Sequence, residues 1–95
     1  MMKLSIIIPC FNEIDTIEKI LKKIKSLNNT EDFEIIVVDD CSTDGTSLIL
    51  SEKCKDYYTI LIKNDKNFGK GYSVRKGVQN ATGQYVLIQD ADLEY

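Results

Sequence analysis

Residues 34–40 read Glu-Ile-Ile-Val-Val-Asp-Asp, and the four consecutive apolar residues in this stretch decide the fold class. Successive side chains of a β-strand point to opposite faces, so four apolar residues in a row predict a strand that is buried on both faces. Such strands are typical of parallel sheets that carry helices on both sides. We therefore expect an α/β fold with this strand inside a parallel sheet.

Strand and helix patterns alternate on either side of this stretch. Short apolar runs predict three further strands, at residues 4–8, 58–62 and 85–89. Apolar residues three and four positions apart predict an amphipathic helix from Asp15 to Leu27, and shorter helices follow at about 48–54 and 72–81. Asp15 and Glu18 have the spacing of a capping box, and Gly83 is expected at the C-cap of the last helix.

Right-handed crossovers limit the ways in which four parallel strands can be connected. If the first three strands wind one way and the fourth returns beside the first, the strand order is 3-2-1-4, a Rossmann-like arrangement. Ligands of such sheets bind at the carboxyl ends of the strands, where the strand order reverses. The predicted site therefore lies between the first and fourth strands.

Composition excludes several classes of function. The chain has 95 residues, with 12 basic and 15 acidic side chains and a net charge of −3, which suits one small domain and no nucleic-acid partner. Histidine is absent, so this segment offers neither a histidine base nor a histidine-ligated zinc. The three cysteines form no Cys-x-x-Cys pair and are typical of reduced thiols in the cytoplasm. No apolar run in this part reaches the ~18 residues of a transmembrane segment.

Acidic or amide side chains follow all four predicted strands. The pairs are Asn12 with Glu13, Asp39 with Asp40, Asn64 with Asp65, and Asp90 with Asp92. The carboxyl ends of parallel strands meet at one edge of the sheet, so these groups are expected to gather there. An alternative for Asp39 and Asp40 is capping of the helix that follows.

Residues 89–94 read Gln-Asp-Ala-Asp-Leu-Glu. In an extended segment Asp90, Asp92 and Glu94 would point to one side, and three neighbouring carboxylates suit a hard divalent cation. The alternative is a strand end whose carboxylates are simply solvated.

Glycine patterns argue against two common phosphate sites. The sequence has neither a Gly-x-Gly-x-x-Gly turn after the first strand nor a P-loop. Residues 69–71, Gly-Lys-Gly, open a predicted helix and could offer backbone N–H groups to an anion, although an ordinary glycine turn is at least as good an interpretation. A nucleoside diphosphate with a leaving group, handled through a metal, fits the carboxylates better.

Four motifs carry a family resemblance: Ile-Ile-Pro-Cys-Phe-Asn-Glu (7–13), Ile-Ile-Val-Val-Asp-Asp-Cys-Ser-Thr-Asp-Gly-Thr (35–46), Asn-Phe-Gly-Lys-Gly (67–71) and Gln-Asp-Ala-Asp-Leu-Glu-Tyr (89–95). In order and spacing they resemble the nucleotide-sugar half of family-two glycosyltransferases, which have the GT-A fold. The branch most similar is that of the polyprenyl- and dolichyl-phosphate sugar synthases. The resemblance covers essentially the whole chain.

The resemblance implies a set of site residues. It implies that the nucleotide pocket is lined by Pro9, Phe11 and Glu13, that Asp40 contacts the base, and that Lys70 also belongs to the substrate site. The metal ligands that it implies are Asp90, Asp92 and Glu94, with Asp90 also bordering the ribose. Cys41 departs from the usual glycine of the family, and because a β-carbon restricts positive φ we expect the turn after Asp40 to be shifted.

The activity implied is inverting transfer from a UDP- or GDP-sugar, with Mg²⁺ or Mn²⁺, to a polyprenyl phosphate or a glycan. No catalytic base can be named. We expect residues 1–95 to be the N-terminal part of a GT-A domain, truncated after the Asp-x-Asp motif and inactive alone, in a cytoplasmic protein that in full length lies at the inner face of a membrane. The alternatives are a non-catalytic nucleotide-binding remnant and a receiver-like phosphoacceptor domain, although a receiver would carry its Asp pair after the first strand.

Overall fold

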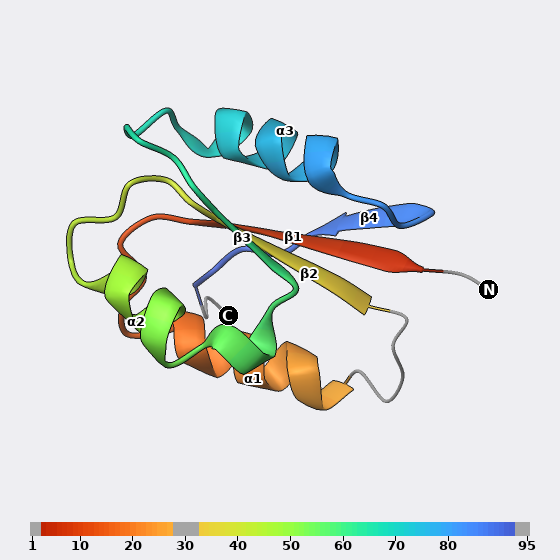
Figure 1. The fold of residues 1–95 in the computed structure, drawn as a ribbon, viewed down its shortest axis with the longest axis horizontal. Coiled ribbons are helices and arrows are strands. Elements are labelled where there is room, and N and C mark those ends of the chain that lie inside the picture. The colour runs from red at the N-terminus through yellow and green to blue at the C-terminus, as the bar shows by residue number, and fades with distance from the viewer. Residues whose placement is uncertain (1–2, 28–32, 93–95) are drawn as a thin grey trace.

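The computed structural model describes residues 3–27 and 33–92, which form a four-stranded sheet flanked by helices (Figure 1). The elements in chain order are β1 (Leu4–Cys10), α1 (Ile17–Leu27), β2 (Phe33–Asp39), α2 (Thr46–Glu52), the 3₁₀ helix η1 (Lys55–Tyr57), β3 (Ile60–Lys63), α3 (Lys70–Asn80) and β4 (Tyr85–Ile88). All three strand pairs are parallel, and the order is β3-β2-β1-β4. The predicted fold class and strand order are confirmed.

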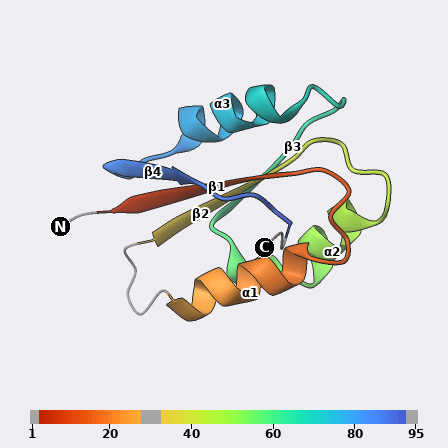
Figure 2. The ribbon, with the colours of Figure 1, turned by 180° about the vertical axis from the view of Figure 1, so that it is seen from behind.

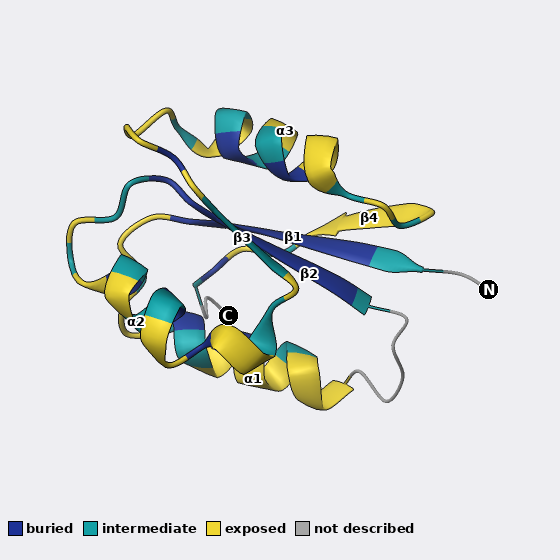
Figure 3. Ribbon diagram, viewed as in Figure 1, coloured by how far each residue is buried: buried dark blue, intermediate teal, exposed yellow. Residues whose placement is uncertain are grey.

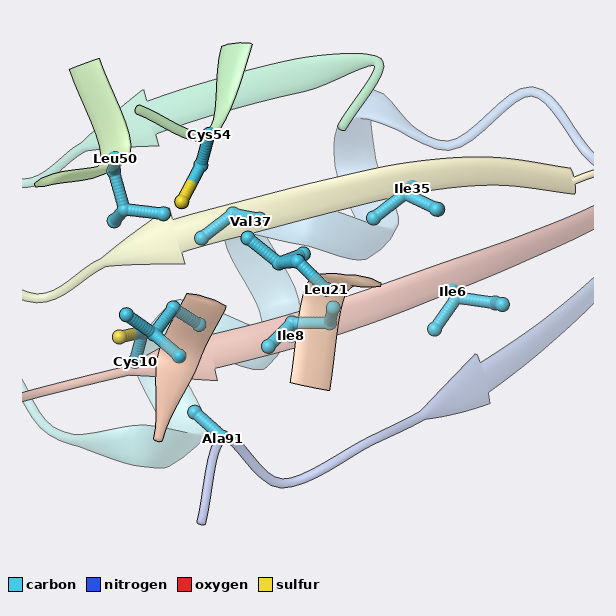
Figure 4. Packing of buried hydrophobic residues seen from close by; sticks show 10 residues of the cluster. Ile6, Ile8, Cys10, Leu21, Ile35, Val37, Leu50, Cys54 and Ala91 are labelled. Carbon is cyan, nitrogen blue, oxygen red and sulfur yellow. The ribbon is translucent and has the colours of Figure 1, made fainter. Parts of the chain in front are cut away.

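Helices cover both faces of the sheet, as the apolar run of β2 predicts. Helix α3 lies on one face, and α1, α2 and η1 lie on the other (Figures 1 and 2). Residues 34–40 are all buried (Figure 3). Alternate residues of the central strands serve the two layers: Ile7, Ile36 and Val38 form one core cluster, and a larger cluster includes Ile8, Val37 and Leu21 (Figure 4).

Strand β1 continues through Pro9 to Cys10, whereas we expected it to end at Ile8. The carbonyl of Ile7 accepts the N–H of Gln89, and the carbonyl of Cys10 accepts the N–H of Asp40. Peptide groups of alternate residues face opposite neighbours, so Pro9 faces the side of β4, which ends at Ile88. The missing N–H of Pro9 therefore interrupts no ladder, and proline is tolerated here.

Several helix boundaries differ from the predicted ones. Helix α1 begins at Ile17 because the carbonyl of Glu13 first accepts the N–H groups of Thr16 and Ile17 in a turn, and among the described residues Asp15 forms no capping box. Helix α2 spans Thr46–Glu52 and α3 starts at Lys70, both two residues earlier than expected. Strand β3 starts at Ile60 rather than at Tyr58, because the chain leaves the 3₁₀ helix η1 only after Tyr57 and then joins the sheet.

Gly83 is not the C-cap of α3. The C-cap is Ala81, in an extended conformation. A β-carbon on Gly83 would lie 2.6 Å from Ser5 Oγ and 2.8 Å from the carbonyl oxygen of Lys3. The backbone N–H of Gly83 donates to Ser5 Oγ at 2.9 Å. Gly83 is therefore required for close approach to the start of β1.

A buried carboxylate joins the amino ends of the strands to the loop after α3. Glu34 is only 4% exposed, and its carboxylate accepts hydrogen bonds from Ser5 Oγ at 2.7 Å, Thr82 N at 2.8 Å and Thr82 Oγ1 at 2.8 Å. Burial alone would raise the pKa of Glu34, but these hydrogen bonds outweigh it, so the pKa is lowered. The carboxylate is thus a fixed anchor rather than a solvated surface group.

Strand β4 is the exposed edge of the described sheet. It pairs with β1, and its four apolar residues are between 39% and 57% exposed. An exposed edge strand of this kind can pair with another chain. None of the helices in the described ranges has the length and apolar character needed to cross a membrane.

Candidate functional site

A pocket of about 230 Å³ lies at the carboxyl ends of β1 and β4, where the strand order reverses. Its lining residues are Pro9, Cys10, Phe11, Glu13, Asp40, Lys70, Ser73, Asp90, Ala91 and Asp92. Every residue predicted to bind substrate lines this pocket, and so does Asp92. Three lining residues were not predicted from the sequence. They are Cys10, Ser73 and Ala91, whose small side chains form part of the pocket wall.

The carboxylate of Asp40 holds the loop that precedes α3. It is buried, and it accepts hydrogen bonds from Phe68 N at 2.8 Å, Gly69 N at 2.9 Å and Asn64 Nδ2 at 2.9 Å. Asn64 is placed for this by β3 and also donates to Ser73 Oγ at 3.1 Å. Asp40 is therefore a structural support of the pocket wall, and its contact with a base stays a prediction.

Asp39 orders the turn before α2, but it does not cap that helix, which was the alternative that we weighed for both aspartates. Its carboxylate accepts the N–H of Ser42 at 3.1 Å and the hydroxyl of Ser42 at 2.6 Å, together with the hydroxyl of Ser47 in α2. All of these donors belong to the turn between β2 and α2 or to the first turn of the helix. Asp39 faces this turn and does not line the pocket.

The turns after β1 and β2 interlock beside the pocket. Asn12 Oδ1 accepts the N–H of Thr43 at 2.7 Å, and Asn12 N donates to Ser42 Oγ at 3.0 Å. Asn12 and Cys41 have positive φ angles of 53° and 62°. Cys41 thus adopts a positive φ despite its β-carbon. The expected shift of the turn relative to the family stays a prediction. Strain of about 1–3 kcal/mol is stored in this turn.

The segment after β4 is anchored through Ala91. This residue is buried in the same cluster as Ile8 and Leu21 (Figure 4), and its carbonyl accepts the hydroxyl of Thr16 at 2.7 Å. The chain bends at Ala91 and Asp92, so the expected fully extended row of carboxylates is wrong for this part. Asp90 and Asp92 nevertheless both line the pocket. Glu94, the third predicted ligand, lies outside the described residues.

Lys70 spans the pocket from the start of α3 to the end of β4. Its Nζ lies 2.5 Å from Asp90 Oδ1, and both side chains are more than half exposed. The hydrogen bond to Asp90 raises the pKa of Lys70, and the negative charges of Asp90 and Asp92 add to this effect. The lysine is therefore positively charged and faces the two carboxylates.

The carboxylates of the pocket suit a hard divalent cation. No group of three acidic, histidine or cysteine side chains able to hold a metal occurs in ranges 3–27 and 33–92. Mg²⁺ sites that also contain substrate phosphates commonly use only one or two protein carboxylates. The oxygen donors of Asp90 and Asp92 fit such a site.

The buried thiol of Cys10 is not equipped for nucleophilic chemistry. Burial raises its pKa far above the ordinary value, and the negative charges of Asp39, Glu13 and Asp44 raise it further. The nucleophilic form of a cysteine is the thiolate, which this environment disfavours. Cys10 therefore serves as a small apolar part of the wall.

Comparison with known proteins agrees with this geometry. The model of the family described as "Glycosyl transferase family 2" matches residues 5–95. The chain belongs to this family. The matched range contains all the pocket residues and every strand except the first residue of β1, so the site described above lies within the part of the chain that matches the family.

Among curated proteins, the chain is 34% identical to a dolichol-phosphate mannosyltransferase of Pyrococcus furiosus over 94 residues, which are 99% of this chain and 27% of that protein. The chain spans about a quarter of the length of the curated relatives that it matches.

Two solved structures of GT-A glycosyltransferases are similar to this family-two chain. The S. aureus TarS 1–349 complex with UDP-GlcNAc has a TM-score of 0.83 and 32% identity, over 96% of this chain and 27% of that one. The mannosyltransferase PcManGT from Pyrobaculum calidifontis, in complex with GDP-Man and Mn²⁺, has a TM-score of 0.86 and 29% identity, over 96% of this chain and 28% of that one.

Proposed function

We propose that the pocket binds the nucleoside diphosphate of a nucleotide sugar together with a divalent cation, as the donor half of an inverting glycosyltransferase. The observation that carries the proposal is the convergence of Asp90 and Asp92 with Phe11, Glu13 and Asp40 at the reversal of strand order. The similar solved structures hold UDP-GlcNAc in one case and GDP-Man with Mn²⁺ in the other, which supports this class of ligand.

The base and ribose would occupy the side of the pocket formed by β1 and β2. Phe11 is 42% exposed, so it offers an aromatic surface on which a base can pack. A carboxylate has about four lone-pair sites. Three hydrogen bonds to Asp40 come from the protein, so one site is left for a donor N–H of the base. Asp40 would then both support the loop and contact the nucleotide.

The diphosphate would lie near Asp90 and Asp92, which would hold Mg²⁺ or Mn²⁺. When bound, the cation neutralises negative charge on the leaving diphosphate. Lys70 adds a positive charge on the opposite wall, where it can contact a phosphate oxygen. The carboxylates therefore orient the leaving group, and the chain itself supplies no general base to which we assign a role.

A polyprenyl phosphate is the acceptor that we favour. This rests on the similarity to a dolichol-phosphate mannosyltransferase. A phosphate oxygen is already anionic and needs no proton acceptor, which agrees with a pocket that has carboxylates for a metal but no histidine. Since the chain spans about a quarter of its curated relatives, we expect these 95 residues to bind donor without transferring sugar.

Calorimetry with UDP and GDP tests the proposal. Binding of at least one of them should require Mn²⁺ or Mg²⁺ and should be lost in a chelator. Asp92→Asn should weaken it about tenfold or more, as for loss of a hydrogen-bonded charged group. Asp56→Asn, at an exposed position in η1, is the matched control and should bind as the unmodified chain does. Equal affinity for nucleotide with and without metal would contradict the role of the carboxylates.

Transfer to polyprenyl phosphate separates an enzyme from a non-catalytic nucleotide-binding remnant. A longer chain that contains these residues should form glycosylated lipid in the presence of Mn²⁺ and the sugar nucleotide. Nucleotide binding without any transfer by that longer chain would favour the remnant.

A further inference from the structure

The ion pair between Lys70 and Asp90 joins two exposed side chains, whereas the backbone that leads to Lys70 is held in place. The backbone before Lys70 is held by Asp40, which accepts the N–H groups of Phe68 and Gly69. The lysine side chain is 62% exposed, and it extends from this fixed point toward a carboxylate that is 57% exposed. The ammonium group can therefore leave Asp90 without disturbing the loop or the helix.

The position of Lys70 is not explained by helix stability. It is the first residue of α3, whose first turn contains no acidic residue. A cation at a helix N-terminus is opposed by the helix dipole, since the N-terminus carries partial positive charge. The neighbouring carboxylates compensate for this placement, so a lysine here points to the pocket rather than to the helix.

The charges of the pocket determine what happens when ligands enter. Asp90 and Asp92 carry two negative charges, and Lys70 balances one of them. A divalent cation between the two carboxylates would repel the ammonium group, whereas a diphosphate beside that cation would attract it. The same lysine should therefore oppose the cation alone and favour the nucleotide diphosphate.

We propose that Lys70 is an exchangeable counter-ion, which neutralises Asp90 in the free protein and moves to a phosphate of the donor when a divalent cation binds. This inference rests on the proposed function of the pocket. It adds that metal and nucleotide bind in a coupled manner through a residue that is not itself a metal ligand.

The test is calorimetry of the 95-residue chain and its variants, with Mn²⁺ alone and then with UDP and GDP at saturating Mn²⁺. Lys70→Gln, which keeps a long polar side chain without charge, should bind Mn²⁺ alone about two- to fivefold more tightly, the range expected for loss of an exposed ion pair. It should bind the nucleotide about fivefold or more weakly. Lys70→Arg retains the charge and should resemble the unmodified chain in both titrations.

The matched control is Lys66→Gln, which removes the same charge from the loop that leads to α3. Lys66 is exposed, and among the described residues it forms no ion pair. Its loss should change neither affinity by more than about twofold, as expected for a screened surface charge. Circular dichroism establishes that each variant is folded.

The outcomes separate the inference from the proposed function. If Lys70→Gln binds Mn²⁺ no more tightly than the unmodified chain, while metal-dependent nucleotide binding is intact, the counter-ion exchange is wrong and the proposed function stands. A parallel loss of both affinities in this variant would also overturn the exchange. If the unmodified chain shows no metal-dependent binding of either nucleotide, both proposals are overturned.

Discussion

The carboxylate of Asp40 accepts the backbone N–H of Gly69 at 2.9 Å, and this contact joins the end of β2 to the start of α3. Because Lys70 follows Gly69 directly, the position of the lysine over the pocket depends on a buried aspartate two strands away from Asp90. The pocket wall therefore combines residues that follow β2 with residues that follow β4, on either side of β1.

Replacement of Asp40 should loosen the loop before α3 as well as weaken nucleotide binding. Asp40→Ala leaves three hydrogen-bond donors without their partner, so the free energy of unfolding should fall by about 2–4 kcal/mol. Hydrogen exchange of the Phe68 and Gly69 amides should accelerate. Asp65→Ala, at an exposed neighbouring position, should leave both amides protected. If hydrogen exchange of the Phe68 and Gly69 amides is unchanged in Asp40→Ala, the carboxylate of Asp40 does not support this loop.

Cys41→Gly should stabilise the fold. The residue has a φ of 62°, which strains any side chain with a β-carbon. Relief of this strain is partly offset by the greater freedom of glycine in the unfolded chain, so a net gain of about 0.5–1 kcal/mol is expected in urea unfolding. Cys41→Ala keeps the β-carbon and should give no gain. Equal stabilisation by both variants would show that the thiol, rather than φ, is unfavourable.

Gly77→Ala should destabilise the contact of α3 with the sheet. A β-carbon at this position would lie 2.4 Å from Ile7 Cγ2, in the middle of the buried layer. Overpacking of this kind lowers stability by about 1–3 kcal/mol. Gly71→Ala is the control in the same helix, because its β-carbon would meet only the flexible Arg75 side chain at 3.5 Å. That variant should be neutral or more stable by thermal unfolding, and a loss equal to that of Gly77→Ala would contradict the packing argument.

Acid should remove the stabilisation that Glu34 supplies. Its folded-state pKa lies below the ordinary value of 4.5, so its contribution is complete above that value and is lost as the pH falls through the folded pKa. The stability difference between the unmodified chain and Glu34→Gln should therefore shrink when urea unfolding is repeated below about pH 4. Glu52→Gln, at an exposed position, should show no such convergence. A difference that is constant with pH would mean that the folded pKa is not lowered.

The sheet was predictable from the sequence because its signal is local and repeated. Residues 35–38 are apolar on both faces, and the turn residues that follow each strand fix the direction of the chain. The ends of the strands and helices were harder to predict, since they depend on contacts between segments that are distant in the sequence. Pro9 belongs to β1 only because β4 ends beside it, and Gly83 is determined by Ser5 rather than by the helix before it.

The pocket residues were predictable because the carboxyl ends of the parallel strands lie together. The structural role of each residue was not predictable. Asp39 and Asp40 are neighbours in the sequence, yet one organises the turn to α2 and the other holds the loop before α3. Each carboxylate accepts hydrogen bonds from the segment on its own side of β2: the turn before α2 for Asp39, and the loop before α3 for Asp40. The alternating geometry of the strand could have separated the two, since Asp39 is the last strand residue and Asp40 follows it.

The central claim is that a divalent cation and a nucleoside diphosphate meet at Asp90 and Asp92. The most direct measurement is the broadening of backbone amide signals by Mn²⁺, recorded by nuclear magnetic resonance with and without UDP or GDP. We predict broadening centred on the amides of residues 90–92 and Lys70, enhanced by at least one nucleotide and lost in Asp92→Asn, while the signal of Thr82, near the amino ends of the strands, stays sharp. Broadening centred elsewhere, or broadening at this site that neither nucleotide changes, would contradict the account.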